Sequence, residues 1–352
     1  MTKPSPAAAR LREEASKRIL LTDGAFGTMI QRYGLSEAQY RGSLHVNRDQ
    51  KGNNDILALT RPDIVDEITR GYLLAGSDIV STNTFTSTRI SQADYGTEAL
   101  VTEINRAAAE IARAAASEAE ATDGRPRFVA GALGPTNKTL SLSPDVNDPG
   151  FREVDFDGVK ATYSEQIAAL VDGGVDFILI ETIFDTLNAK AAIMAVMEEE
   201  ERRGVELPLM ISMTITDLSG RNLSGHSVEA FWYAVRHAKP LTIGLNCSFG
   251  AEQLRPHVQA LSGIADTLLM AYPNAGLPND LGQYDETPST TGGFIGDWGR
   301  QGLLNIVGGC CGTTPEHIAA MAAAIAGLPP RNPAGLAPVT RLAGLDPMVF
   351  AA

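Results

Sequence analysis

Short apolar runs and longer segments with helical spacing follow one another in regular order along this chain. The eight runs span residues 19–22, 78–85, 128–133, 177–183, 209–215, 241–247, 267–271 and 303–307. Each run is continuously apolar, as in strands buried on both faces of a parallel sheet. The segments between the runs carry turn residues and then apolar residues at helical intervals, which indicates helices. The pattern therefore predicts strands and helices in strict alternation.

A faint internal repeat supports this interpretation. Residues 75–80 and 173–178 both place a glycine at the end of a helical segment and then an aspartate, Asp78 or Asp176, at the start of a strand. Their separation fits two strand–helix units of about 50 residues each. Eight such units that close on themselves form a (β/α)₈ TIM barrel of about 250 residues plus insertions. An open doubly wound sheet is the alternative, but no G-x-G-x-x-G follows the first strand.

The pattern also divides the chain. Residues 19–327 form the expected single barrel domain, residues 1–18 an N-terminal extension, and residues 328–352 a proline-rich linker or tail. Long irregular stretches at 31–54, 136–157 and 272–291 all follow the carboxyl end of a strand. In this fold that end carries the active site, so we expect long functional loops around the C-terminal mouth.

Composition excludes several classes of partner. The net charge of −13, without a cluster of basic and aromatic residues, argues against nucleic acid and anionic membrane surfaces. No apolar run approaches the roughly 18 residues that span a bilayer, and the N-terminus lacks the apolar core of a secretory signal. We therefore expect a cytoplasmic protein. The three cysteines, an odd and low number, do not indicate a disulfide framework.

The cysteines instead indicate a metal site. Cys247 ends one predicted strand, and Cys310 and Cys311 follow another, with one strand between the two. The carboxyl ends of these strands open onto the same mouth, where the three thiols can meet. Zinc prefers thiolates in tetrahedral geometry, and three protein ligands leave the fourth position for substrate. Buried apolar cysteines, or a redox role of the adjacent pair, are the alternatives. Gly308 and Gly309 permit positive φ, which we expect to turn the paired thiols toward one ion.

Several longer segments stand at or near the expected strand ends: 23–28 (DGAFGT), 51–55 (KGNND), 81–85 (STNTF), 133–137 (LGPTN), 143–147 (SPDVN), 181–186 (ETIFDT), 246–248 (NCS), 274–278 (NAGLP) and 308–313 (GGCCGT). They resemble the zinc-dependent homocysteine S-methyltransferases, and most closely the homocysteine-binding module of cobalamin-dependent methionine synthases. The similarity extends from about residue 20 to 345. The resemblance implies a barrel that holds Zn²⁺ through the catalytic ligands Cys247, Cys310 and Cys311.

Further residues are candidates for binding L-homocysteine. Asp23 could accept hydrogen bonds from its ammonium group, and the resemblance supports Glu181 in the same role. Backbone N–H groups of the loop formed by Gly24, Ala25, Gly27 and Thr28 could receive its carboxylate. Asp23 could instead form a turn, and Glu181 could pair with a basic residue of the barrel.

Two asparagines complete the candidate site. Asn274 could fill the fourth zinc position when substrate is absent. Asn83 is a further strand-end candidate for substrate binding, with a hydrogen-bonded core asparagine as the alternative. The histidines show no H-x-H or H-E-x-x-H spacing, which argues against a zinc hydrolase.

The resemblance implies that the methyl donor is methylcobalamin, carried on another domain or subunit, and that cobalamin-binding and folate-binding modules are partners. A betaine- or S-methylmethionine-dependent enzyme is the nearest alternative. Such an enzyme needs a closed pocket, typically aromatic for a quaternary ammonium, and only Tyr33, Tyr40, Trp232 and Tyr233 are loose candidates for its wall. A noncatalytic zinc-binding scaffold subunit is an alternative of another class.

Overall fold

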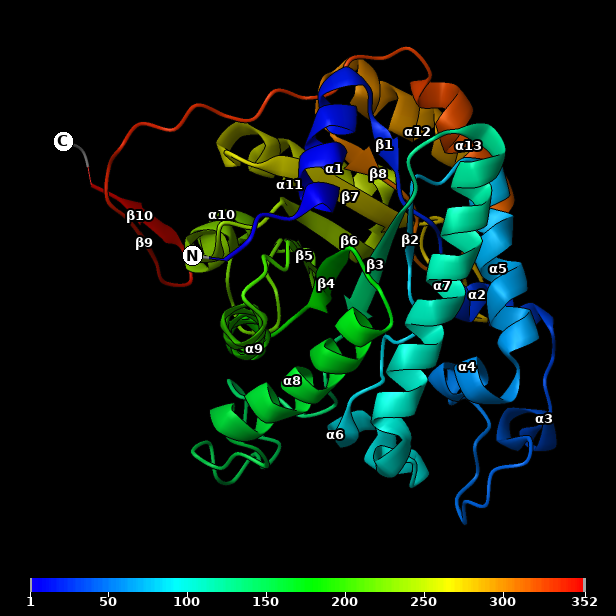
Figure 1. Ribbon diagram of the computed structural model, residues 1–352. Coiled ribbons are helices and arrows are strands. Elements are labelled where there is room, and N and C mark those ends of the chain that lie inside the picture. The colour runs from blue at the N-terminus through cyan, green and yellow to red at the C-terminus, as the bar shows by residue number, and fades with distance from the viewer. Residues whose placement is uncertain (1, 351–352) are drawn as a thin grey trace.

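Eight parallel strands form the centre of the molecule, and helices surround them (Figure 1). The computed structural model describes residues 2–350. The strands are hydrogen-bonded in the order β1-β8-β7-β6-β5-β4-β3-β2. All eight overlap the runs expected from the sequence: β1 (Leu20–Leu21), β2 (Ile79–Ser81), β3 (Phe128–Leu133), β4 (Phe177–Ile183), β5 (Leu209–Met213), β6 (Thr242–Gly250), β7 (Leu268–Asn274) and β8 (Ile306–Val307). The prediction of a single-domain (β/α)₈ barrel is confirmed.

The helices alternate with the strands and cover the outer face of the sheet. The outer layer consists of α5 (Pro62–Ala75), α7 (Val101–Asp123), α8 (Phe156–Asp172), α9 (Thr186–Arg203), α10 (Val228–Val235), α11 (Ala251–Ile264), α12 (Pro288–Arg300) and α13 (Pro315–Ile325). Further helices occupy the loops and the N-terminus: α1 (Pro6–Lys17), α2 (Phe26–Arg32), α3 (Glu37–Arg41), α4 (Leu57–Thr60), α6 (Arg89–Gln92) and the 3₁₀ turns η1 (Asn54–Ile56), η2 (Ala93–Tyr95), η3 (Glu98–Leu100) and η4 (Arg236–Ala238).

Asp78 joins β1 to β2, where the sheet closes on itself. Its N–H donates to the carbonyl oxygen of Leu21 at 2.7 Å, and its buried carboxylate accepts the N–H of Leu21 at 2.9 Å. Asp176 makes the equivalent pair of bonds to β3 from the position just before β4. Its N–H donates to the carbonyl oxygen of Val129, and its carboxylate accepts the N–H of Val129 at 2.8 Å. The two aspartates of the sequence repeat therefore connect neighbouring strands through hydrogen bonds.

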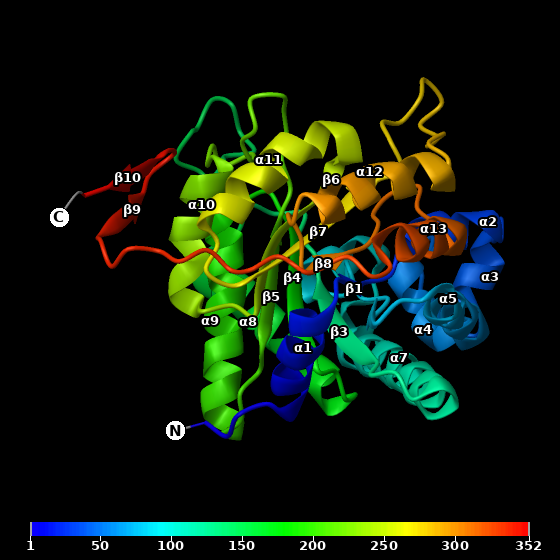
Figure 2. The ribbon, with the colours of Figure 1, turned by 90° about the horizontal axis from the view of Figure 1, so that it is seen from above.

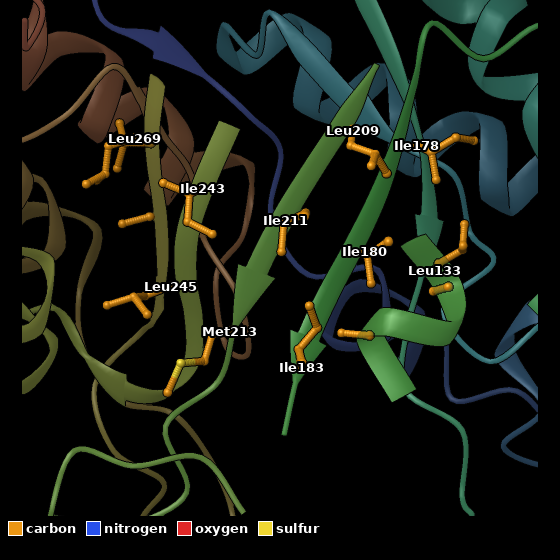
Figure 3. Packing of buried hydrophobic residues seen from close by; sticks show 14 of the residues in the cluster. Leu133, Ile178, Ile180, Ile183, Leu209, Ile211, Met213, Ile243, Leu245 and Leu269 are labelled. Carbon is orange, nitrogen blue, oxygen red and sulfur yellow. The ribbon is translucent and has the colours of Figure 1, made fainter. Parts of the chain in front are cut away.

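Alternate side chains of each strand face opposite layers. In β4, Phe177 and Leu179 belong to the cluster inside the barrel, whereas Ile178 and Ile180 pack in the layer between the strands and the helices (Figure 3). Burying each of these side chains stabilises the fold by roughly 1.5–3 kcal/mol. The same alternation directs Glu181, the next odd-numbered residue, toward the barrel interior near its mouth.

Helix α1 closes the amino-terminal end of the barrel. Its side chains Ala8, Leu11 and Ala15 are buried and belong to the interior cluster with Phe128 and Phe177. The N-terminal extension therefore packs against the core of the barrel. Because the amino-terminal end is filled, the large accessible space lies at the carboxyl ends of the strands.

After α13 the chain runs back across the barrel and ends in a two-stranded hairpin, β9 (Arg341–Ala343) and β10 (Pro347–Val349), beside α10 (Figure 2). Arg331 anchors this stretch from a buried position, where its guanidinium donates to the carbonyl oxygens of Ser262 and Thr267. The division of the chain at residues 18 and 327 stays a prediction. Within residues 2–350, no helix combines the length and the apolar character required to cross a bilayer.

Candidate metal centre and substrate cavity

A cavity of about 940 Å³ lies at the carboxyl ends of the strands. Most of the candidate residues line it: Asp23, Gly24, Ala25, Gly27, Thr28, Asn83, Glu181, Cys247, Cys310 and Cys311. They come from the ends of β1, β2, β4, β6 and β8 or from the loops that follow, so the barrel brings together groups that are far apart in the chain. Asn274 does not line this cavity.

The three cysteine thiols converge at the base of the mouth. Their Sγ atoms all lie within 4.8 Å of one another, and those of Cys247 and Cys311 are 3.9 Å apart. A tetrahedral zinc ion with Zn–S bonds of about 2.3 Å places its sulfur ligands about 3.8 Å apart. The residues therefore fit the zinc ion that the sequence predicts, and the cluster could hold one through three sulfur atoms.

A reversal of the backbone aims Cys247 into the mouth. Ile243 and Leu245 of β6 point to the outer layer, so strict alternation would direct Cys247 outward as well. Instead, the register with β7 shifts after Asn246, and Cys247 and Ser248 adopt positive φ of 60° and 63°. Such bulges re-aim side chains next to active sites. This reversal carries no signal in the sequence.

The glycines before the cysteine pair serve a different purpose from the one expected. Neither Gly308 nor Gly309 has positive φ, so the prediction of a left-handed turn at these positions is wrong. A Cβ atom on Gly308 would clash with Thr22 and lie 2.7 Å from the carbonyl oxygen of Asp23, and one on Gly309 would clash with Thr313. Glycine is required at both positions because the chain directly after β8 passes very close to the residues directly after β1 and to Thr313.

Contacts among the three thiols give them different pKa values. Hydrogen bonding with Cys247 and Cys310 lowers the pKa of Cys311 to about 3. Contacts with the other two thiols, together with burial, raise the pKa of Cys310 well above its usual value. A contact with Cys310 acts to lower the pKa of Cys247, but Cys311 and burial outweigh it and raise this pKa to about 11. The thiols therefore oppose one another's ionisation, and a bound cation would favour the thiolate forms.

Two carboxyl groups extend the acidic character of the cavity. Burial, together with the negative charges of Asp23 and Cys311, raises the pKa of Glu181 to about 8. Burial also raises the pKa of Asp23 to about 6, although Ser81 donates both its N–H (2.7 Å) and its hydroxyl (2.8 Å) to this carboxylate. A ligand with a positive charge would relieve the repulsion between these groups.

The loop after β1 connects the two candidate subsites. Ala25 precedes helix α2 and has no side-chain cap, and its N–H approaches the hydroxyl oxygen of Thr313 at 3.3 Å. Thr28 accepts the N–H of Gly312 at 2.9 Å, directly after the cysteine pair. These bonds hold the loop of Gly24, Ala25, Gly27 and Thr28 against the segment that carries Cys310 and Cys311.

The two candidate asparagines are both buried and hydrogen-bonded. The Oδ1 atom of Asn274 accepts the backbone N–H of Cys311 at 3.1 Å, so this side chain holds the backbone of a candidate ligand. Asn83 donates to the carbonyl oxygen of Asn54 at 2.8 Å and also lines the cavity. Their roles toward metal and substrate stay predictions.

Sequence reasoning missed several residues of the cavity. Tyr272 lines it and carries a buried hydroxyl that lies near Glu181 and Ser212. Tyr284 lies against Gly312, at the position where a Cβ atom would otherwise stand. Of the four aromatic residues considered from the sequence, none lines the cavity, and five others do: Phe26, Phe85, Tyr95, Tyr272 and Tyr284. Phe26 and Phe85 stand in the shared segments 23–28 and 81–85, whereas no short motif marks Tyr95, Tyr272 and Tyr284, which only the folded barrel brings to the cavity.

A cavity with a sulfur cluster at the C-terminal mouth of a (β/α)₈ barrel has the position that active sites take in enzymes of this fold. Sequence comparison makes this specific, because the family described as homocysteine S-methyltransferase matches residues 20–325. The chain belongs to this family and is a methyltransferase.

Solved structures of the homocysteine methyltransferase MmuM from Escherichia coli share the fold. The metallated form superposes with a TM-score of 0.70 at 22% identity, and the match covers 90% of this chain and 99% of that one. The oxidized form gives a TM-score of 0.68 at 22% identity, with 87% and 95% covered. At this identity the likeness supports the barrel architecture over nearly the whole of both chains.

Proposed function

We propose that this protein activates L-homocysteine at a zinc ion held by Cys247, Cys310 and Cys311 and transfers a methyl group to its sulfur, which gives methionine. The observation that carries the proposal is the convergence of three thiols at tetrahedral spacing beside the buried carboxyl group of Asp23 and the partly buried one of Glu181. Membership of the homocysteine S-methyltransferase family supports it. When bound, zinc would lower the pKa of a thiol in its fourth position and leave the sulfur nucleophilic.

The protein's own residues would bind and orient the amino acid. Asp23 and Glu181 would accept hydrogen bonds from the ammonium group, which would favour their ionised forms. The backbone N–H groups of the loop that holds Gly24, Ala25, Gly27 and Thr28 would receive the carboxylate. With the thiol fixed at the cysteines, these contacts would hold the sulfur in one orientation toward the donor carbon.

The polar residues around this site would have supporting roles. Asn83 would contribute to the substrate-binding wall beside the first loop. Asn274 would take the fourth position in the absence of substrate only after releasing the N–H of Cys311. Because the cluster depends on reduced thiols, we propose a cytoplasmic location.

For the methyl donor we propose methylcobalamin on another domain or subunit, with cobalamin-binding and folate-binding modules as partners. The segments shared with the methionine synthase module support this donor. The size of the cavity is compatible with it, since about 940 Å³ is near the upper limit for pockets that enclose a drug-sized ligand, and homocysteine is far smaller.

One observation favours a second candidate donor. Phe85, Tyr95 and Tyr284 line the cavity together with Asp55 and Asp94, and aromatic faces and carboxylates attract cations. A small cationic donor such as betaine or S-methylmethionine would then bind in the outer part of the same cavity.

The experiment is a methionine-formation assay with the purified, zinc-loaded protein, homocysteine and each of the three donors in turn. We expect turnover with methylcobalamin, and Glu181→Gln should reduce it at saturating donor. Turnover with betaine or S-methylmethionine alone would assign the second candidate. Turnover with none of them, in a protein that retains zinc, would contradict the proposal and favour the scaffold alternative.

A further inference from the structure

We infer that Asn246 is a positioning residue that joins the strand end carrying Glu181 to the sulfur cluster. It sets the relation between the ammonium and thiol subsites, so the inference deepens the proposed function and rests on it. Neither the sequence motifs nor the proposed chemistry assigned this side chain a task. Its position in β6, directly before Cys247, places it between the two groups.

Both polar atoms of the Asn246 side-chain amide make hydrogen bonds. The side chain is 1% exposed. Its Oδ1 atom accepts the N–H of Thr182 at 3.0 Å and the hydroxyl of Ser212 at 2.6 Å, and its Nδ2 atom donates to the hydroxyl of Thr182 at 2.8 Å. The Nδ2 atom also lies 4.0 Å from the Sγ atom of Cys310. One side chain thus contacts β4, β5 and the segment after β8.

The contact with β4 holds an unfavourable backbone conformation. Thr182 has a φ of 56°, in the left-handed region that is rare and unfavourable for a β-branched residue. The register between β4 and β5 shifts at the same place, between Ile180 and Ile183. Asn246 binds both the N–H and the hydroxyl of Thr182, so it stabilises the bulge that follows Glu181. Without these bonds Thr182 can relax, and Glu181 loses its fixed direction.

The contact with sulfur acts on the other subsite. Asn246 immediately precedes Cys247, whose φ of 60° aims its thiol into the mouth. An N–H group near the sulfur of Cys310 withdraws electron density from a thiolate and stabilises its charge. The bulges of β4 and β6 are therefore held to each other and to Cys310 by one amide. A change at Asn246 should disturb the carboxylate and the sulfur cluster together.

A purely structural asparagine would behave differently, and the chain offers a matched control. Asn305 is also 1% exposed and also makes two strong side-chain hydrogen bonds, accepting the N–H of Leu269 at 2.9 Å and donating to the carbonyl of Arg331 at 2.7 Å. It lies just before β8, at the opposite end of that strand from the cysteine pair. Asn305→Ala should lower stability without a specific effect on the site.

The test compares Asn246→Ala, Asn246→Asp and Asn305→Ala with the unmodified full chain. Cobalt(II) replaces zinc, and the sulfur-to-cobalt charge-transfer band and the Kd for homocysteine are measured. We expect both Asn246 variants to shift the band and to weaken homocysteine binding about tenfold or more, whereas Asn305→Ala changes only the unfolding temperature. The aspartate keeps the acceptor for Thr182 and Ser212, so it separates the effect on sulfur from general loss of folding.

The outcomes distinguish this inference from the proposed function. If the unmodified protein binds homocysteine and the Asn246 variants match Asn305→Ala in both readouts, the positioning role is wrong and the proposed function stands. If the unmodified protein does not bind homocysteine, the proposed function fails. In that case a band shift confined to the Asn246 variants still supports the contact with Cys310. If the band does not shift in these variants, the contact with Cys310 is contradicted as well.

Discussion

The Sγ atoms of Cys247 and Cys311 lie 3.9 Å apart although 64 positions separate the two residues in the chain. Strands β6 and β8 flank β7, so their carboxyl ends reach the same rim. The cluster thus has the spacing of a metal site in the fold itself. We therefore expect each thiol to be needed for binding the proposed zinc ion.

Replacing one of these thiols should remove the metal. The Cys311→Ala protein keeps only two of the three sulfur ligands. We therefore expect its zinc affinity to fall by more than the roughly 10–100-fold loss that changes outside the ligand shell cause. Metal content after dialysis against a weak chelator measures this. Ser248→Ala, which alters the neighbour of Cys247, should retain about one zinc ion per chain. Equal metal content in both variants would contradict the assignment.

Glu181 should make stability depend on pH. Its pKa is about 8 in the folded protein and 4.5 as the ordinary value, so the folded state binds the extra proton between these limits. Its contribution is therefore complete below pH 4.5 and is lost as pH rises through 8. Glu181→Gln should be more stable than the parent at pH 9, by on the order of 4 kcal/mol, and similar at pH 4.5. If the free energies of unfolding of the two metal-free proteins depend on pH in the same way across this range, the pKa of Glu181 is not raised.

Substrate binding should also release a proton from the same group. At pH 7 the carboxyl group of Glu181 is largely protonated, and the ammonium of homocysteine favours its ionised form. Titration calorimetry in buffers of different ionisation enthalpy counts the protons released. We expect the parent to release up to about one proton more than Glu181→Gln, in which the thiol and Asp23 remain as the sources of released protons. Identical proton counts would place the ammonium elsewhere.

Gly308 should not tolerate even a methyl group. A Cβ atom there would clash with Thr22 and with the carbonyl oxygen of Asp23, so Gly308→Ala should cost roughly 1–3 kcal/mol and weaken zinc retention. Gly293 in α12 has open space around its Cβ position, and Gly293→Ala should leave stability equal or raise it by about 0.5–1 kcal/mol. Urea unfolding of both variants, with metal analysis, tests the contrast. A stable, zinc-retaining Gly308→Ala protein would disagree with the observed close approach.

Arg331 should stabilise the barrel far from the active site. Its buried guanidinium donates to the carbonyl oxygens of Ser262, Ala265 and Thr267, and removing it takes these hydrogen bonds from all three acceptors. Arg331→Ala should lower the free energy of unfolding by on the order of 3 kcal/mol and leave the zinc content unchanged. The exposed Arg300, paired with Asp297, serves as the control, since its loss should cost less than about 1 kcal/mol. Similar losses in the two variants would show that the buried bonds contribute little.

The order of strands and helices could be predicted from local pattern. Continuous apolar runs mark strands buried on both faces, and the repeated aspartates Asp78 and Asp176 mark equivalent units, because burial and strand pairing act on short segments. The candidate ligands Cys247, Cys310 and Cys311 could also be found, since parallel strands in a closed barrel direct all carboxyl ends to one mouth. Eight strands, their succession and the cysteines at their ends thus follow from the sequence alone.

Tertiary structure decided which way the side chains point. Regular alternation would turn Cys247 away from the mouth, and only the bulge after Asn246 reverses it. The role of Asn246, the place of Tyr284 against Gly312 and the lack of space at Gly308 likewise depend on segments distant in the chain. A strained backbone angle persists only where surrounding contacts hold it, and such contacts form when the barrel closes. For this reason local sequence pattern located the site, whereas packing determined its geometry.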